Sequence, residues 1–167
     1  MTIDRIREIE NKALDIINDV FIDEYAFNLP INITKITNAL GLNLKEGKFN
    51  NEEIVGAYDR KSQTIYLAKD GHYTRKVFTI AHEIGHFVLH VDKEQETFFK
   101  KDLMFVDKDD VPAEQEANCF AASLLMPKGT VLRYFKITKD TETLAAAFGV
   151  SYSAMRLRLK NLELVEV

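Results

Sequence analysis

The chain has 167 residues, of which 46% are hydrophobic and 29% are charged, so it can build one soluble domain with a core. Its net charge of −4 argues against a protein whose whole surface binds nucleic acid non-specifically. A single cysteine excludes an internal disulfide, the charged N-terminus lacks a signal-peptide core, and no apolar run approaches the roughly 18 residues of a membrane span. We therefore expect one cytoplasmic domain, residues 1–167, with no membrane contact.

The first part of the chain predicts two helices followed by a hairpin. Apolar residues recur at helical spacing through residues 3–27, which predicts a long amphipathic helix that serves as a scaffold. Pro30 interrupts the pattern, residues 33–40 predict a short second helix, and Gly41 suits the end of that helix. Residues 54–68 hold two runs rich in β-branched and aromatic residues around a polar turn, which predicts a β-hairpin.

The middle of the chain predicts two longer helices separated by a loop. The first begins near Gly71 and runs to about His90, because its apolar residues recur at helical intervals. Residues 91–111 are mostly polar and acidic, and we expect them to form a long functional loop. Pro112 suits the first turn of a second helix, which we expect over residues 113–126.

The last third predicts a short helix around residues 129–136 and then a helix-turn-helix segment over residues 141–159. Ser151 is the expected N-cap of its second helix. No linker rich in proline, serine or glycine separates this segment from the rest, so we expect it to pack on the core. The expected parts are an N-terminal helix, a core and a C-terminal helical subregion: residues 1–28, 30–127 and 128–167. Together they predict a mostly helical α+β fold with a small antiparallel sheet.

The segment HEIGHFVLH, residues 82–90, carries the strongest chemical signal. It holds three of the four histidines and begins with H-E-x-x-H, a zinc-hydrolase signature. Residues four apart on a helix share a face, so His82 and His86 can direct ring nitrogens at one ion. Glu83 lies beside the first of these ligands and can take a proton from a metal-bound water. Gly85 permits the close approach of another backbone.

A catalytic zinc site needs a third protein ligand beside an open position. The helix expected over residues 113–126 offers Glu114 and Glu116. We favour Glu114, because Asn118 lies four residues later on the same face and can then hydrogen-bond a histidine ring. Glu116 points about 200° away and is the alternative if the helix is rotated.

Two other candidates for metal or nucleophilic chemistry are less suitable. His90 lies eight residues after His82, about 12 Å along a helix, so one ion cannot bind both together with His86. We expect His90 to have a structural or supporting role. Cys119 lies in an alanine-rich helix beside an aromatic residue, which indicates a buried, inert thiol.

These segments resemble the ImmA/IrrE family of metallo-endopeptidases over about residues 30–165. The resemblance is carried by HEIGHFVLH, by EQEANCFAASLLMP at residues 114–127, and by the AFGVS turn followed by MRLRL near the C-terminus. It implies a zinc peptidase with a gluzincin-like core, in which an antiparallel sheet lies beside the H-E-x-x-H helix. Characterised members act on helix-turn-helix repressors and release mobile-element or stress-response genes.

The resemblance also assigns residues. His82 and His86 match the zinc-binding histidines, Glu83 matches the catalytic base and Glu114 matches the third ligand. We therefore expect a zinc-dependent endopeptidase whose partner is a helix-turn-helix transcriptional repressor. One strand of the residue 54–68 hairpin can hold the substrate if it lies at a sheet edge. Candidate oxyanion donors are four tyrosines, among which the sequence does not choose: Tyr58, Tyr66, Tyr73 and Tyr152.

Two alternatives stay open. A relative that has lost activity would bind a repressor without cutting it. The C-terminal helix-turn-helix can also bind DNA, through Arg156, Arg158 and Lys160. We do not expect DNA binding, because the chain is acidic and this basic cluster is short. In the simpler interpretation, leucines at positions 157, 159 and 162 pack on the core while the arginines are solvated.

Overall fold

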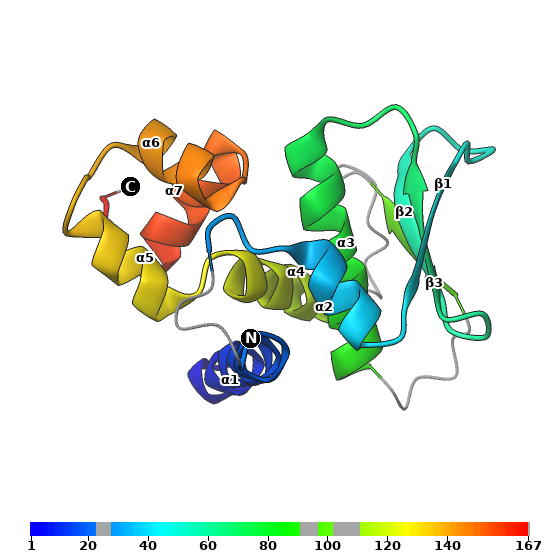
Figure 1. Ribbon diagram of the computed structural model, residues 1–167, viewed down its shortest axis with the longest axis horizontal. Coiled ribbons are helices and arrows are strands. Elements are labelled where there is room, and N and C mark those ends of the chain that lie inside the picture. The colour runs from blue at the N-terminus through cyan, green and yellow to red at the C-terminus, as the bar shows by residue number, and fades with distance from the viewer. Residues whose placement is uncertain (23–27, 91–96, 102–110, 167) are drawn as a thin grey trace.

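The computed structural model describes residues 1–22, 28–90, 97–101 and 111–166, and within them it has seven helices and one four-stranded sheet. In chain order the elements are α1 (Ile3–Val20), α2 (Ile33–Ala39), β1 (Asn43–Gly47), β2 (Ile54–Asp59), β3 (Thr64–Ala68), α3 (Tyr73–Leu89), β4 (Thr97–Lys101), α4 (Val111–Leu125), α5 (Lys128–Phe135), α6 (Thr141–Phe148) and α7 (Tyr152–Asn161). The mostly helical α+β fold is confirmed. Figure 1 shows the sheet on one side of the molecule with α3 beside it, α4 in the middle, and α5 to α7 at the opposite side.

The sheet has the strand order β1-β3-β2-β4 and is mixed. The predicted hairpin is present, with β2 antiparallel to β3 and Tyr58 opposite Ile65. Our prediction of a purely antiparallel sheet was wrong, because β1 pairs with β3 in parallel. Its sequence, NLKEG, gave no strand signal because only one of its five residues is even half-buried. Both hairpin strands are internal, and the edges are β1 and β4.

The prediction of a loop over residues 91–111 was partly wrong. Residues 97–101 form β4, which pairs antiparallel with β2, and Val111 already belongs to α4. The rest of that range, 91–96 and 102–110, lies outside the described residues. Pairing with a distant strand is a long-range event, which explains why the local pattern did not reveal it.

The helix boundaries follow capping chemistry. The hydroxyl of Thr2 accepts from the backbone N–H of Arg5 at 3.2 Å and so caps α1. The helix ends at Val20, whereas we expected it to reach residue 27, and residues 23–27 lie outside the described residues. Gly41 follows α2 with φ +71°, as its expected role requires. Ser151 caps α7 by accepting from the N–H of Ala154 at 3.2 Å, which confirms that prediction.

The C-terminal helices pack on the rest of the chain through a different set of residues than expected. Leu159 is buried, but Leu157 is 58% exposed and Arg158 only 5% exposed. The Arg158 Nε donates to the carbonyl oxygen of Met126 at 3.1 Å, and its Nη1 lies 3.0 Å from Oε1 of Glu10. The simpler interpretation was therefore wrong about Leu157 and Arg158, because α7 turns positions 155, 158 and 159 inward. Arg158 is consequently not available to a phosphate.

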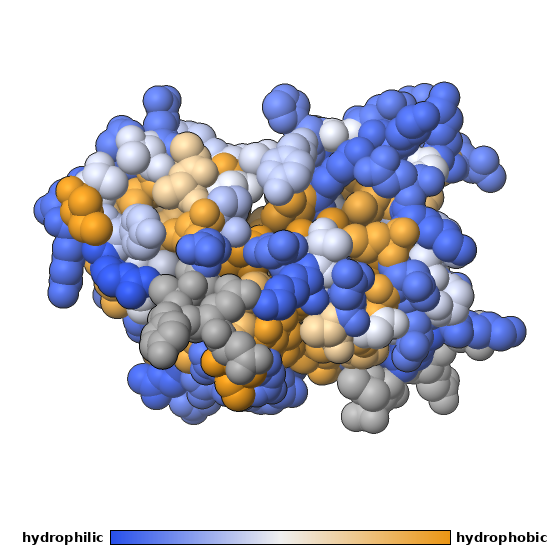
Figure 2. Space-filling model, viewed as in Figure 1, coloured by the Kyte–Doolittle hydropathy of each residue, from blue (hydrophilic) through white to orange (hydrophobic). Residues whose placement is uncertain are grey.

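Hydrophilic side chains cover most of the outer surface in Figure 2, and hydrophobic residues show mainly where helices and sheet meet. One connected core of buried residues reaches from α1 through the sheet and α3 to α7. Among the described residues, no helix is both long and apolar enough to cross a membrane.

Candidate metal centre

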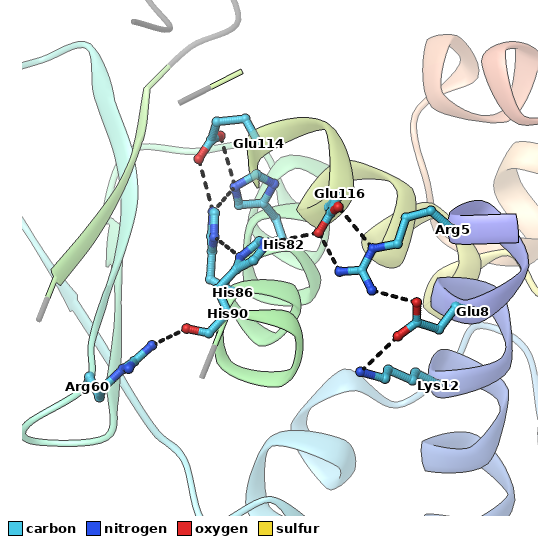
Figure 3. A network of polar contacts seen from close by, with 9 residues as sticks. All are labelled: Arg5, Glu8, Lys12, Arg60, His82, His86, His90, Glu114 and Glu116. Carbon is cyan, nitrogen blue, oxygen red and sulfur yellow. Dashed lines mark hydrogen bonds and ion pairs between the residues drawn. The ribbon is translucent and has the colours of Figure 1, made fainter. Parts of the chain in front are cut away.

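Two histidines of α3 point toward each other and away from solvent. His82 is fully buried and His86 is 1% exposed. Their Nε2 atoms are 3.0 Å apart (Figure 3). At this distance the two ring nitrogens can share a proton or a cation. The helix therefore presents two preorganised nitrogen donors.

Glu114 of α4 completes a group of three. Its Oε2 lies 3.2 Å from the Nε2 of His82, and its Oε1 lies 3.0 Å from the Nε2 of His86. One ligand atom of each residue lies within 4.8 Å of the other two. Burial alone would raise the pKa of Glu114, but hydrogen bonds from both histidines outweigh it and hold the pKa well below the usual range. The carboxylate is thus kept ionised.

The donor set fits a divalent zinc ion. Two imidazole nitrogens and one carboxylate form a typical ligand set of catalytic zinc sites, which leave one position open. The three side chains are 0%, 1% and 15% exposed, so the site is largely shielded from water. Glu116, the alternative ligand from the sequence, lies elsewhere, because its carboxylate pairs with Arg5 of α1 at 2.6 Å.

Gly85 explains how α3 and α4 come close enough for His82, His86 and Glu114 to converge. A Cβ at this position would lie 3.1 Å from the Cα and 3.2 Å from the carbonyl oxygen of Ala117, and 3.3 Å from the Cβ of Phe120. The absence of a side chain therefore allows the two helix backbones to touch. This confirms the expected close approach and identifies α4 as the partner.

Glu83 is fully buried and lies toward the sheet. A Cβ added to Gly56 of β2 would lie 3.5 Å from its Oε1 and would collide with the Cγ2 of Thr79. Gly56 thus leaves room for the side chain of Thr79, and the Glu83 carboxylate lies within van der Waals distance of the same position. Our sequence interpretation did not single out Gly56, although a glycine inside a strand pattern is a known sign of close approach.

Each histidine of the centre is backed by another side chain. The Nδ1 of His82 lies 2.9 Å from Oδ1 of Asn118, the contact that the spacing of Glu114 and Asn118 suggested. The Nδ1 of His86 lies 3.0 Å from the Nδ1 of His90. His90 therefore stands behind the site, as expected of a supporting residue. Such contacts fix ring orientation and tautomer in metal sites.

The remaining candidates differ in exposure. Tyr58 is 1% exposed, packs edge-on against Phe87 at 5.8 Å, and burial raises the pKa of its hydroxyl. Tyr73 and Tyr152 are 67% and 50% exposed. Cys119 is half-buried, less than expected, and burial raises the pKa of its thiol, which keeps it protonated.

Comparisons with known proteins place this geometry in context. The family model described as IrrE N-terminal-like domain, a peptidase family, matches residues 37–160. The chain is 30% identical to immunity region protein 2 of Bacillus phage phi105 over 115 aligned residues. The alignment covers 65% of this chain and 70% of that protein. A solved Mycobacterium tuberculosis transcriptional regulator is similar with a TM-score of 0.69 and 16% identity. That similarity covers 92% of this chain but only 46% of the regulator, and it concerns the fold.

Proposed function

The chain belongs to the IrrE N-terminal-like domain family of metallopeptidases, and on that basis we propose that it is a zinc-dependent endopeptidase of the ImmA/IrrE type. The observation that supports this most is the convergence of His82, His86 and Glu114 on one point, with Glu83 fully buried and next to His82 in the helix. In this proposal the three converging residues hold the ion and Glu83 is the catalytic base.

The chemistry divides between the ion and the chain. When bound, zinc supplies a Lewis acid that polarises the scissile carbonyl and acidifies water. Glu83 takes the proton of the attacking water and then gives it to the leaving amine, so one carboxylate serves both halves of the reaction. Asn118 orients His82, and the Glu83 carboxylate lies on the side of α3 that faces Gly56 of β2. Burial of the whole group excludes water that would weaken these interactions.

The hairpin of residues 54–68 does not meet the condition under which we expected it to hold the substrate, because neither of its strands lies at a sheet edge. A peptide can extend a sheet only at an edge strand, and the two hairpin strands both have neighbours on each side. Of the two edges, β4 contacts α3, the helix that carries the histidines. We therefore assign the peptide to the edge of β4, where its backbone would pair antiparallel or parallel to residues 97–101.

A repressor is the substrate class we propose. One relative is described as an immunity region protein of a phage, and the structural neighbour as a transcriptional regulator. Both descriptions fit a peptidase that works beside a helix-turn-helix repressor and whose cleavage releases mobile-element or stress genes.

The test is a cleavage reaction. The zinc-loaded chain is mixed with a helix-turn-helix repressor encoded next to its gene, and fragments are resolved by mass spectrometry. Glu83→Gln should retain zinc and lose cleavage, whereas Glu142→Gln, a matched change at an exposed site on α6, should cut like wild type. Cleavage by Glu83→Gln would contradict the mechanism. Repressor binding without cleavage by the wild type would instead favour a non-proteolytic regulator.

DNA binding needs a separate measurement. Burial of Arg158 against Glu10 leaves Arg156 and Lys160 as the exposed basic residues of the short cluster. We expect no mobility shift of DNA fragments even at low salt, where phosphate contacts are strongest.

A further inference from the structure

A continuous line of polar contacts leads from the metal centre to the N-terminal helix (Figure 3). Behind His86, the Nδ1 atoms of His86 and His90 are 3.0 Å apart. The Nε2 of His90 lies 3.2 Å from Oε2 of Glu116. Glu116 in turn accepts two hydrogen bonds from Arg5, from Nη2 at 2.6 Å and from Nε at 2.9 Å. Four residues thus connect α3, α4 and α1.

The ionised Glu116 at the end of this line determines which ring nitrogen of each histidine carries the proton. An ionised carboxylate only accepts hydrogen bonds, so the Nε2 of His90 must carry the proton that points at Glu116. In neutral His90 the Nδ1 then has a lone pair, and it can accept the Nδ1–H of His86. With a cation between the three residues, His86 then offers a lone pair on Nε2, the atom that faces His82 and Glu114, instead of the proton that it donates to Glu114 without the cation. With the opposite tautomers, a proton on the Nε2 of His86 would occupy the ligand position.

Arg5 holds Glu116 in the orientation that this order requires. Its Nε and Nη2 donate to the two different oxygens of the carboxylate, and such a charge-assisted fork fixes the direction of both. Glu8, one turn further along α1, accepts from the third nitrogen of Arg5 at 2.7 Å and limits its rotation. At the other side, Arg60 donates to the carbonyl oxygen of His90 at 2.5 Å and fixes the end of α3.

We propose that His90, Glu116 and Arg5 are positioning residues that select the metal-binding tautomer of His86, and that α1 therefore contributes to the metal centre. The inference rests on the proposed function, because it assumes that His86 is a ligand. It assigns a role to a helix that precedes the family-matched region, which begins at residue 37. It also changes our interpretation of α1 from the sequence, in which the helix was only a scaffold.

The first test measures zinc affinity by competition with a chromophoric chelator. Loss of such supporting contacts typically weakens metal binding by about 10–100-fold, and we expect that range for His90→Leu. His90→Asn should recover most of the affinity, because its side-chain oxygen can accept from His86 as Asn118 accepts from His82. Arg5→Met should weaken binding several-fold. Arg7→Met is the matched control, because Arg7 lies on the same helix, is 73% exposed and forms a long ion pair of 3.8 Å with Asp4.

The second test observes the protons directly. Long-range ¹⁵N–¹H correlation spectra of the zinc-loaded protein should place the proton of His86 on Nδ1 and that of His90 on Nε2. In Arg5→Met the His90 signals should shift toward a mixture of tautomers, which a purely structural role of Arg5 would not cause.

The outcomes separate this proposal from the proposed function. If zinc binds the wild type with the same affinity as His82→Ala, the metal site itself is wrong and the positioning role is overturned with it. If zinc binds through His82 but His90→Leu and Arg5→Met bind it as tightly as Arg7→Met, only the positioning role is overturned. A proton on the Nδ1 of His90 in the loaded wild type would also overturn it.

Discussion

Replacement of Gly85 by alanine is the sharpest test of how the metal centre is built. Gly85 lies on α3 between His82 and His86, and it faces the backbone of α4. A Cβ there would lie 3.1 Å and 3.2 Å from two backbone atoms of Ala117. Backbone cannot rotate away as a flexible side chain can, so the helices must separate by a few tenths of an ångström.

The expected magnitude follows from two opposing effects. Alanine in a helix interior is about 1 kcal/mol more favourable than glycine. Overpacking a tight contact costs about 1–3 kcal/mol. We therefore expect a net loss of about 1 kcal/mol in the free energy of unfolding of the metal-free protein. The effect on zinc should be larger, because ligand distances tolerate shifts of only about 0.2 Å. A displaced Glu114 should weaken binding on the order of tenfold.

Urea unfolding of the metal-free proteins and chelator competition measure these two effects separately. Gly129→Ala is the matched control, since a Cβ at that helical position would meet nothing within 4 Å. It should leave stability unchanged or slightly raised, and zinc affinity unchanged. If Gly85→Ala behaves like Gly129→Ala in both measurements, the contact between α3 and α4 does not set the geometry of the site.

Four further predictions concern contacts around the centre and in the C-terminal helices. Asn118→Ala should weaken zinc binding at least about tenfold by chelator competition with little change in the circular dichroism spectrum, and unchanged affinity would refute its orienting role. Arg158→Ala should cost about 2–3 kcal/mol in urea unfolding, less than a fully buried pair because its partner Glu10 is 20% exposed. A double-mutant cycle with Glu10→Ala should give coupling of about 1–2 kcal/mol, whereas additive losses would contradict the pair. Gly149→Ala should lower the melting temperature, since φ is +65° and a Cβ would lie 2.7 Å from a proline ring, at a cost of about 1–3 kcal/mol. The hydrogen bond from Arg5 is the main cause that lowers the pKa of Glu116 in the folded protein. The ionised carboxylate therefore stabilises the fold above its ordinary pKa of about 4.5, and this stabilisation is lost as the pH falls through the lower pKa of the folded state. The fall in melting temperature below about pH 4.5 should thus be shallower in Glu116→Gln, and an identical profile would count against it.

The parts of the fold that follow local rules were predictable. Helical periodicity, capping residues and a polar turn located the helices and the hairpin, because each depends on neighbours within a few positions. β1 and β4 were not predictable in this way. Their pairing partners lie far along the chain, and β1 is too exposed to show alternation.

The site shows the same division. The pair His82 and His86 follows from one helical turn. The pairing of Glu114 with Asn118 also follows from helix geometry, once a third ligand is sought. The contact of Arg5 with the site could not be predicted, because Arg5 lies 111 positions before its partner Glu116 and no motif in the N-terminal sequence indicates the contact. Its role depends on how α1 packs against α4, which only the tertiary structure shows.

The choice between the two glutamates of α4 is ultimately a question of helix rotation. Glu114, Ala117 and Asn118 are spaced by three and four residues, so they share the face that meets α3. One residue of that face supplies the carboxylate, one lies against Gly85 and one orients His82. Turning α4 to bring Glu116 to the histidines would withdraw all three at once. It would also remove Glu116 from Arg5. The close packing at Gly85 and the support behind both histidines therefore favour the same arrangement, in which Glu114 faces the two histidines as the proposed ligand and Glu116 belongs to the line of contacts behind them.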